Sequence, residues 1–508
     1  MEMDKTTKMT VETTTRMAPS SNSGNPMTRL SLTADASSAA ASADQFPSET
    51  LSTDRLMKAT PVPVPNEPNL YYIPKGLSPV YRPIRPLWEA ALWLVSSATV
   101  AALSCDNLLG TIQVMSYSQP DVGAVIRSLR RHRKRLLGLL LRTCLLALAM
   151  RTSLQEIALR PSRIDTQALA NLYHLPSRLS RYEQIPLENK ENTVGVHYLE
   201  SRSKDPIDAP FRALYVNHGF GASSLSWLPA LPVLQDRLGI PIALGHDAAG
   251  FGFSDRPGQV PNASEESPAI LSAKVGISLL QNKGVVTNGT TTERGPVLLM
   301  GHSMGALTTL QMALRMDPGI PKRVILVAPA LGLHGSSKGN SNTASSPPKR
   351  WLTGLTKPLR KMFFDPPAKY ALRRLVGRPN FWRNGLKLAW GDPNRLKDSD
   401  VLRFQWPSIG LGWEQGLLDF TQAQQQSFKT SNDRELFQQV LNLPNTTVSV
   451  IVGSNDRVVP VSRIRAFVEG ISSFVPVVEL DGLGHDPFEE DVERFVSAVD
   501  HLLHHRRF

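Results

Sequence analysis

A serine, an aspartate and a histidine stand in three glycine-containing turns of this 508-residue chain, in that order. Ser303 lies in Gly-His-Ser-Met-Gly, the G-x-S-x-G pattern in which a sharp strand-to-helix turn exposes a serine hydroxyl. Asp456 lies in Gly-Ser-Asn-Asp-Arg, and His485 lies in Gly-Leu-Gly-His-Asp. A histidine can take the proton of an attacking serine, and an aspartate can hold that histidine in the required tautomer. The pattern predicts acyl-transfer chemistry with Ser303 as nucleophile, His485 as general base and Asp456 as its orienting partner.

A serine attack on a carbonyl creates an oxyanion, which needs hydrogen-bond donors that are already aimed at it. The stretch His218-Gly219-Phe220-Gly221 follows a short apolar run, and an H-G-x-G turn at such a point supplies one backbone N–H. The residue after the nucleophile, Met304, supplies a second one. We therefore predict an oxyanion hole formed by the N–H groups of Phe220 and Met304. Taken alone, this stretch also fits an ordinary glycine turn.

Glycines on both sides of Ser303 suit a sharp turn. Gly301 and Gly305 leave room for a strained backbone and for a helix that packs closely on a strand. Each motif has a simpler alternative: a chance match for the serine, a capping role for Asp456 and a plain surface position for His485. Four separate stretches in the order expected for one catalytic site favour the catalytic interpretation.

Other polar residues near these motifs are expected to be structural. His218 and His302 flank the site without a predicted catalytic role. His246 is expected to pack beside Asp247, and Asp486 is expected to begin a helix.

The motifs need elements that bring them together. From about residue 180, short β-branched runs alternate with helical patterns, which predicts a mostly parallel sheet flanked by helices. The predicted strands are Val194–Glu200, Ala213–Asn217, Ile242–Gly245, Val297–Met300, Arg323–Val327, Val448–Val452 and Val475–Leu480. The predicted helices are Leu225–Leu238, Pro268–Gln281, Ala306–Met316 and Phe488–Leu503.

The N-terminal third of the chain has a different character. Residues 1–86 combine a Ser- and Thr-rich stretch, predicted to be disordered, with a proline-rich linker that begins at residue 61. Residues 87–180 contain the apolar run 87–103, the basic cluster 127–135 and a leucine-rich segment after it. We predict a helical, membrane-associated region here, although a helical hairpin packed on the remaining chain is an alternative. If the first segment alone spans, the basic cluster predicts a cytoplasmic catalytic part.

The strand–helix alternation continues over 181–330 and 444–508, and it is interrupted over 331–443 by a block that we predict to be a helical lid. Within this block, 349–403 contain fourteen Lys or Arg and four Asp, interleaved with aromatic residues. Asp398 and Asp400 are expected to be solvated. The net charge of +12 suits an anionic membrane or a nucleic acid, and since no nucleic-acid motif is present, a membrane surface is the predicted partner.

Taken together, these motifs resemble the α/β-hydrolase fold superfamily, within its lid-bearing epoxide-hydrolase-like and lipase-like branch. The stretch Asp247-Ala-Ala-Gly-Phe-Gly-Phe-Ser fits that family's D-x-x-G-x-G-x-S turn. The resemblance covers about 190–508 and implies an eight-stranded, mostly parallel sheet with a lid after the sixth strand. Epoxide hydrolases and haloalkane dehalogenases use an aspartate at the elbow, so Ser303 disfavours both chemistries. Residues 1–180 have no counterpart in the family core.

The sequence thus predicts a serine hydrolase that cleaves a carboxylic ester, in particular of a lipid, through an acyl-enzyme and without a metal or organic cofactor. The two cysteines, Cys105 and Cys144, suggest neither a disulfide framework nor a metal cluster. Three alternatives stay open: acyl transfer or carbon–carbon bond hydrolysis by the same triad, a non-catalytic binding protein with this fold, and nucleic-acid binding by the basic segments.

Overall fold

The computed structural model describes most of the region in which the sheet is predicted. The described residues are 61–73, 175–186, 193–203, 210–256, 267–286, 295–332, 372, 376, 378–409, 413–414, 416–419 and 432–504. They all belong to one unit, Glu49–Phe508. The disordered stretch predicted for 1–60 and the apolar and basic segments predicted for 87–150 lie outside the described residues. So does most of 333–377.

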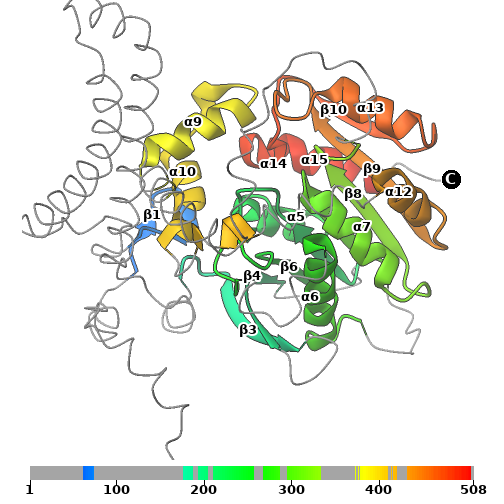
Figure 1. Ribbon diagram of the computed structural model, residues 1–508, viewed down its shortest axis with the longest axis horizontal. Coiled ribbons are helices and arrows are strands. Elements are labelled where there is room, and N and C mark those ends of the chain that lie inside the picture. The colour runs from blue at the N-terminus through cyan, green and yellow to red at the C-terminus, as the bar shows by residue number, and fades with distance from the viewer. Residues whose placement is uncertain are drawn as a thin grey trace, which may run out of the picture. The chain divides into compact units, whose positions relative to one another are not determined.

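Eight strands form one sheet, which confirms the predicted fold class (Figure 1). Their order is β10-β9-β8-β7-β5-β6-β4-β3. The six strands from β10 to β6 run parallel, whereas β4 pairs antiparallel with both β6 and β3. The bounds are β3 Ser180–Pro186, β4 Thr193–Arg202, β5 Ala213–Asn217, β6 Ile242–His246, β7 Val297–His302, β8 Lys322–Val327, β9 Thr446–Gly453 and β10 Val477–Leu480.

Helices cover both faces of this sheet. One face packs against α6 (Pro268–Asn282), α7 (Gly305–Arg315), α12 (Asp433–Leu441) and α13 (Val461–Glu469), which share one apolar core with the strands. The other face packs against the 3₁₀ helix η1 (Ser224–Trp227), α5 (Leu231–Arg237), α14 (Pro487–Glu490) and α15 (Val492–His504), around a second core. Every residue of β5, β6 and β7 is buried, as expected for central parallel strands that are covered on both faces.

Each predicted strand is present, with small shifts at its ends. The strand expected from Val475 begins at Val477. Strand β3 was not predicted, because its sequence Ser-Arg-Tyr-Glu-Gln-Ile-Pro shows no apolar alternation. The single helix expected over 225–238 divides into η1 and α5, and the one expected over 488–503 divides into α14 and α15.

Within the proline-rich segment predicted to be a linker, residues 61–73 are folded. These residues form a hairpin of β1 (Pro63–Val64) and β2 (Glu67–Tyr71). Leu70 is fully buried, and the N–H of Tyr71 donates to the carbonyl oxygen of Pro176 at 3.1 Å. The hairpin is therefore packed against the rest of the fold.

Helix α10 (Asp398–Gln405), from the block predicted to be a lid, lies beside this hairpin in Figure 1, and the Oγ of Ser399 donates to Oε1 of Glu67 at 3.4 Å. Along the chain, this block contains α9 (Pro379–Ala389), the 3₁₀ helix η3 (Pro393–Arg395), α10 and the 3₁₀ helix η4 (Trp406–Ile409), in that order. α9 and α10 share a small apolar cluster that includes Trp382 and Val401. Helix α12, from the same predicted block, instead packs against α7 and β9, and its side chains belong to one of the two apolar cores of the sheet. None of the helices in the described part of the chain has the length and hydropathy needed to cross a bilayer.

Candidate active site

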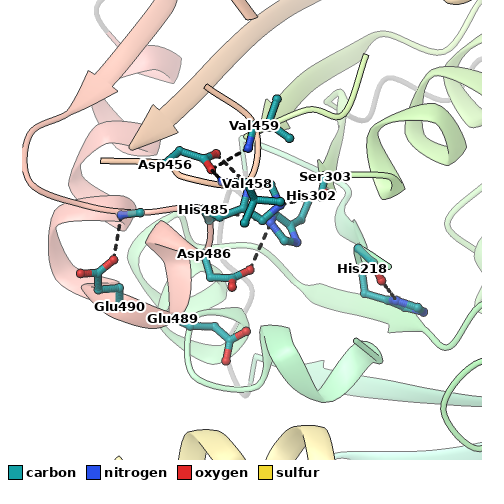
Figure 2. A network of polar contacts seen from close by, with 12 residues as sticks. His218, His302, Ser303, Asp456, Val458, Val459, His485, Asp486, Glu489 and Glu490 are labelled. Carbon is teal, nitrogen blue, oxygen red and sulfur yellow. Dashed lines mark hydrogen bonds and ion pairs between the residues drawn. The ribbon is translucent and has the colours of Figure 1, made fainter. Parts of the chain in front are cut away.

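Three of the predicted site residues follow strands of the parallel part of the sheet. Ser303 comes directly after β7, Asp456 follows the end of β9, and His485 follows β10. Because β7, β8, β9 and β10 are parallel, their carboxyl ends meet at one edge of the sheet. Ligand sites of α/β proteins lie at this edge. The side chains meet there, as Figure 2 shows.

A chain of hydrogen bonds joins the three side chains. The Nε2 atom of His485 lies 3.0 Å from the Oγ of Ser303, and its Nδ1 lies 2.7 Å from Oδ2 of Asp456. The other oxygen of Asp456 accepts hydrogen bonds from the N–H groups of Val458 and Val459, each at 2.8 Å. The carboxylate is thereby fixed, and it can hold the imidazole with Nε2 directed at the hydroxyl. The structure thus brings together the three residues that the sequence predicts to form one site, and their catalytic roles stay a prediction.

The backbone of Ser303 has the strained conformation of a nucleophile elbow. Its φ is 52°, in the left-handed region that a non-glycine residue rarely occupies. Its N–H donates to the carbonyl oxygen of Val327 on the neighbouring strand, at 2.9 Å. Both flanking glycines are needed for close packing: a Cβ on Gly301 would lie 2.6 Å from the oxygen of Gly305, and a Cβ on Gly305 would lie 2.5 Å from the oxygen of His218.

The loop predicted to form the oxyanion hole lies against the elbow. A Cβ on Gly219 would lie 3.0 Å from the Cβ of Ser303, so this loop passes directly beside Ser303. His218 stabilises the loop, since its Nδ1 lies 2.8 Å from the oxygen of Gly219 and its Nε2 accepts from the N–H of Ala248 at 2.9 Å. Gly221 has a φ of +75°, which suits glycine.

The two predicted oxyanion donors come from these two neighbouring segments. Met304 is the residue before helix α7, and Phe220 follows Gly219. The side chain of Phe220 is 54% exposed and contacts the ring of Phe251 edge-on. Their function as oxyanion donors remains a prediction.

The turn that begins at Asp247 is hydrogen-bonded to the loop predicted to form the oxyanion hole and to the segment after it. One oxygen of Asp247 accepts from the N–H of Ser224 at 2.7 Å, and the other accepts from the N–H of Phe253 at 2.8 Å. Burial alone would raise the pKa of Asp247, but the charge and hydrogen bond of His197 lower it below its usual range. The carboxylate is therefore charged, and it links the turn to the start of η1.

His246 is buried next to Asp247, as expected for a structural residue, but its hydrogen bond goes to another partner. The Nδ1 of His246 bonds the Tyr215 hydroxyl at 2.8 Å, and the histidine that pairs with Asp247 is His197 of β4, also at 2.8 Å. The Nε2 of His197 in turn lies 2.9 Å from the Oγ of Ser180. This second Ser–His–Asp arrangement is inaccessible, because Ser180 and His197 are completely buried.

Charges around His485 raise its pKa. Burial lowers the pKa of His485, but the hydrogen bond to Asp456 and the charges of Asp486 and Asp456 outweigh burial and raise that pKa above its usual value. Burial and the nearby His485 hold the pKa of His302 well below its usual range, so His302 is neutral. The Nε2 of His302 lies 3.1 Å from both the His485 oxygen and an oxygen of Asp486. Burial raises the pKa of Asp486 to about 6, although His485 opposes the shift.

A buried ion cluster joins α10 to α14. The sequence pattern did not predict this cluster. The Arg403 guanidinium donates to Asp400 at 2.7 Å and to Glu489 at 2.8 Å, and it lies 3.5 Å from Glu67 of the hairpin. The expectation that Asp400 is solvated is therefore wrong, because its partner Arg403 is buried with it. Asp398 is exposed, as expected.

In the described part of the chain, no group of three His, Cys, Asp or Glu side chains is arranged to hold a metal ion.

A model described as the alpha/beta hydrolase family matches residues 213–498. No curated protein matches the sequence. Among solved structures, a membrane phospholipase A described as a bacterial virulence factor is 17% identical, with a TM-score of 0.42, over 78% of this chain and 97% of that one. A bromoperoxidase from Bacillus anthracis is 18% identical, with a TM-score of 0.43, over 64% of this chain and 99% of that one. The esterase RhEst1 from Rhodococcus sp. ECU1013 is 20% identical, with a TM-score of 0.41, over 64% and 98%. Similarity at this level carries no information about the substrate.

Proposed function

Because the chain belongs to the alpha/beta hydrolase family, we propose that it is a serine hydrolase that cleaves a carboxylic ester through an acyl-enzyme. The observation that carries this proposal is the continuous hydrogen-bonded chain from Ser303 through His485 to Asp456. The left-handed backbone of Ser303 adds support, since such strain persists where the surrounding structure enforces it, as at active sites.

The geometry suggests the following steps. The Oγ of Ser303 attacks the carbonyl carbon while His485 takes its proton, and Asp456 stabilises the imidazolium that forms. The N–H groups of Phe220 and Met304 donate to the oxyanion of the tetrahedral intermediate. His485 then gives the proton to the oxygen of the leaving alcohol. Water attacks the acyl-enzyme by the same route, which releases the acid and restores Ser303.

We further propose that the ester is a lipid and that the enzyme works at a membrane surface. Support comes from the sequence, in which basic and aromatic residues are interleaved over 349–403. On helix α9, Phe381 is 40% exposed and Leu388 is 61% exposed, and Lys387 lies beside Leu388. Exposed apolar side chains with neighbouring cations suit a phospholipid interface.

Hydrolysis of a panel of esters tests the proposed reaction. The panel consists of p-nitrophenyl esters of short and long acids, and of phosphatidylcholine vesicles, each assayed with the wild type and with Ser303→Ala. We expect acid release by the wild type, a preference for long chains and no release by the variant. Activity retained in folded Ser303→Ala contradicts the proposal. Transfer of the acyl group to an added alcohol in preference to water identifies an acyltransferase instead.

Flotation of the full-length protein with vesicles tests the proposed membrane partner. Binding to vesicles with a fifth of anionic phospholipid, and weaker binding to neutral vesicles, is the expected result. Failure to float with either vesicle would refute a membrane surface as the partner, and competition of flotation by RNA alone would favour nucleic-acid binding.

A further inference from the structure

Glu490 of α14 accepts hydrogen bonds from two separate parts of the chain. Its Oε2 accepts from the N–H of Gly484 at 2.8 Å and from the N–H of Gly391 at 2.9 Å. Its Oε1 accepts from the N–H of Asp392 at 2.8 Å. Figure 2 shows the carboxylate beside the backbone that leads into His485. One buried side chain thus joins the histidine loop to the segment after helix α9.

The same segment, residues 389–392, makes further contacts with both catalytic loops. The N–H of His485 itself donates to the oxygen of Ala389 at 2.6 Å. The guanidinium of Arg457, the residue after Asp456, donates to the oxygens of Trp390 at 3.2 Å and Gly391 at 3.0 Å. Segment 389–392 therefore lies between the loop of the base and the loop of the acid, and it is bonded to each.

The backbone of segment 389–392 is in close contact with the backbone of the histidine loop. A Cβ on Gly484 would lie 2.1 Å from the oxygen of Ala389, and a Cβ on Gly391 would lie 2.2 Å from the oxygen of Gly482. Backbone meets backbone here, so the position of the histidine loop depends on where segment 389–392 is held. Glu490 is the side chain that fixes both.

We propose that Glu490 is a positioning residue for the reaction: it holds His485 with Nε2 on Ser303 by clamping the histidine loop to segment 389–392. The inference rests on the proposed serine hydrolase function and deepens it. A charged carboxylate is needed because three N–H donors converge on it, and a carboxylate only accepts. A glutamine keeps the shape but places an NH₂ group against at least one of these donors, and the loop must then shift.

The test is the second-order rate of labelling by a fluorophosphonate, which reacts with an activated serine, in wild type, Glu490→Gln and Glu493→Gln. Glu493 is the matched control, because it lies on the adjoining helix with its side chain 69% exposed and pairs with Arg237 on the surface. We expect Glu490→Gln to slow labelling on the order of 10- to 100-fold, since a misplacement of about 1 Å can cost that much. The control is expected to label at the wild-type rate.

A purely structural Glu490 would give a different pattern. In that case Glu490→Gln lowers the Tm, but its folded fraction labels as fast as wild type and with the same pH dependence, which overturns the inference. If Glu490→Gln does not fold, the exposed Arg457→Gln, which releases the other side of segment 389–392, must slow labelling in the same direction. Absence of labelling in folded wild type would instead refute the proposed function itself.

Discussion

Replacement of Asp456 by asparagine is expected to abolish catalysis while preserving the fold, for a reason visible in its hydrogen bonds. The Oδ1 atom accepts from the N–H groups of Val458 and Val459. These donors require an acceptor, so the amide oxygen of the asparagine must take that position. Its NH₂ group is then directed at Nδ1 of His485, where Oδ2 lies 2.7 Å away in the wild type.

That orientation forces the wrong tautomer on the base. Nδ1 of His485 becomes an acceptor, so Nε2 carries the proton and donates to Ser303 instead of accepting from it. The equivalent change in serine proteases lowers kcat about 10⁴-fold. We expect a loss of the same order here, which corresponds to roughly 5 kcal/mol in the activation free energy.

The assay pairs ester hydrolysis with urea unfolding for Asp456→Asn and Asp456→Ala. The asparagine variant keeps the backbone donors satisfied and should unfold close to wild type. The alanine variant leaves the buried N–H of Val459 without its acceptor and should lose roughly 1–3 kcal/mol of stability. An asparagine variant that retains activity within tenfold of wild type would refute the tautomer argument.

Three further changes have expected outcomes. Asp486→Asn removes a negative charge that raises the pKa of His485, so the acid limb of kcat/KM should move to lower pH. An unchanged or upward-shifted limb would contradict this. The difference in kcat/KM between variant and wild type should shrink below about pH 6, where Asp486 itself is protonated. Arg403→Met leaves Glu489 buried without its cation and should cost about 3–5 kcal/mol in urea unfolding, whereas a loss under about 1 kcal/mol would show that the pair is not needed. Gly305→Ala would ordinarily favour a helix, but its Cβ meets a backbone oxygen at 2.5 Å, so we expect a lower Tm and slower labelling; a higher Tm would refute the packing argument.

That Ser303, Asp456 and His485 lie together could be predicted from sequence, because each stands in a short local motif at the end of a strand. Ser303, Asp456 and His485 are far apart in the chain, but the carboxyl ends of parallel strands bring them to one edge. The elbow glycines were predictable for the same reason, since Gly301 and Gly305 act within a single turn.

Contacts that depend on strand order or on distant segments were not predictable. His197 meets Asp247 because β4 lies antiparallel beside β6, and nothing local to either residue indicates that pairing. Asp400 resembles a solvated residue of a charged helix. Its partner Arg403 is nevertheless buried, where it also pairs with the buried Glu489 of α14.

The hairpin at 61–73 was missed for a related reason. Its prolines indicate an extended chain, and its stability comes from packing against residues more than a hundred positions away, among them Pro176 and Trp406. Such partners leave no signal in the local pattern.

The most direct measurement is to map the site of fluorophosphonate labelling by mass spectrometry in wild type, Ser303→Ala and Ser180→Ala. Ser180 is the matched control, because it also bonds a histidine that pairs with an aspartate, but it is completely buried. We expect a single labelled peptide containing Ser303 in wild type and in Ser180→Ala, and no labelling of Ser303→Ala. Labelling that persists in folded Ser303→Ala, or a wild type that remains unlabelled, would contradict Ser303 as the nucleophile.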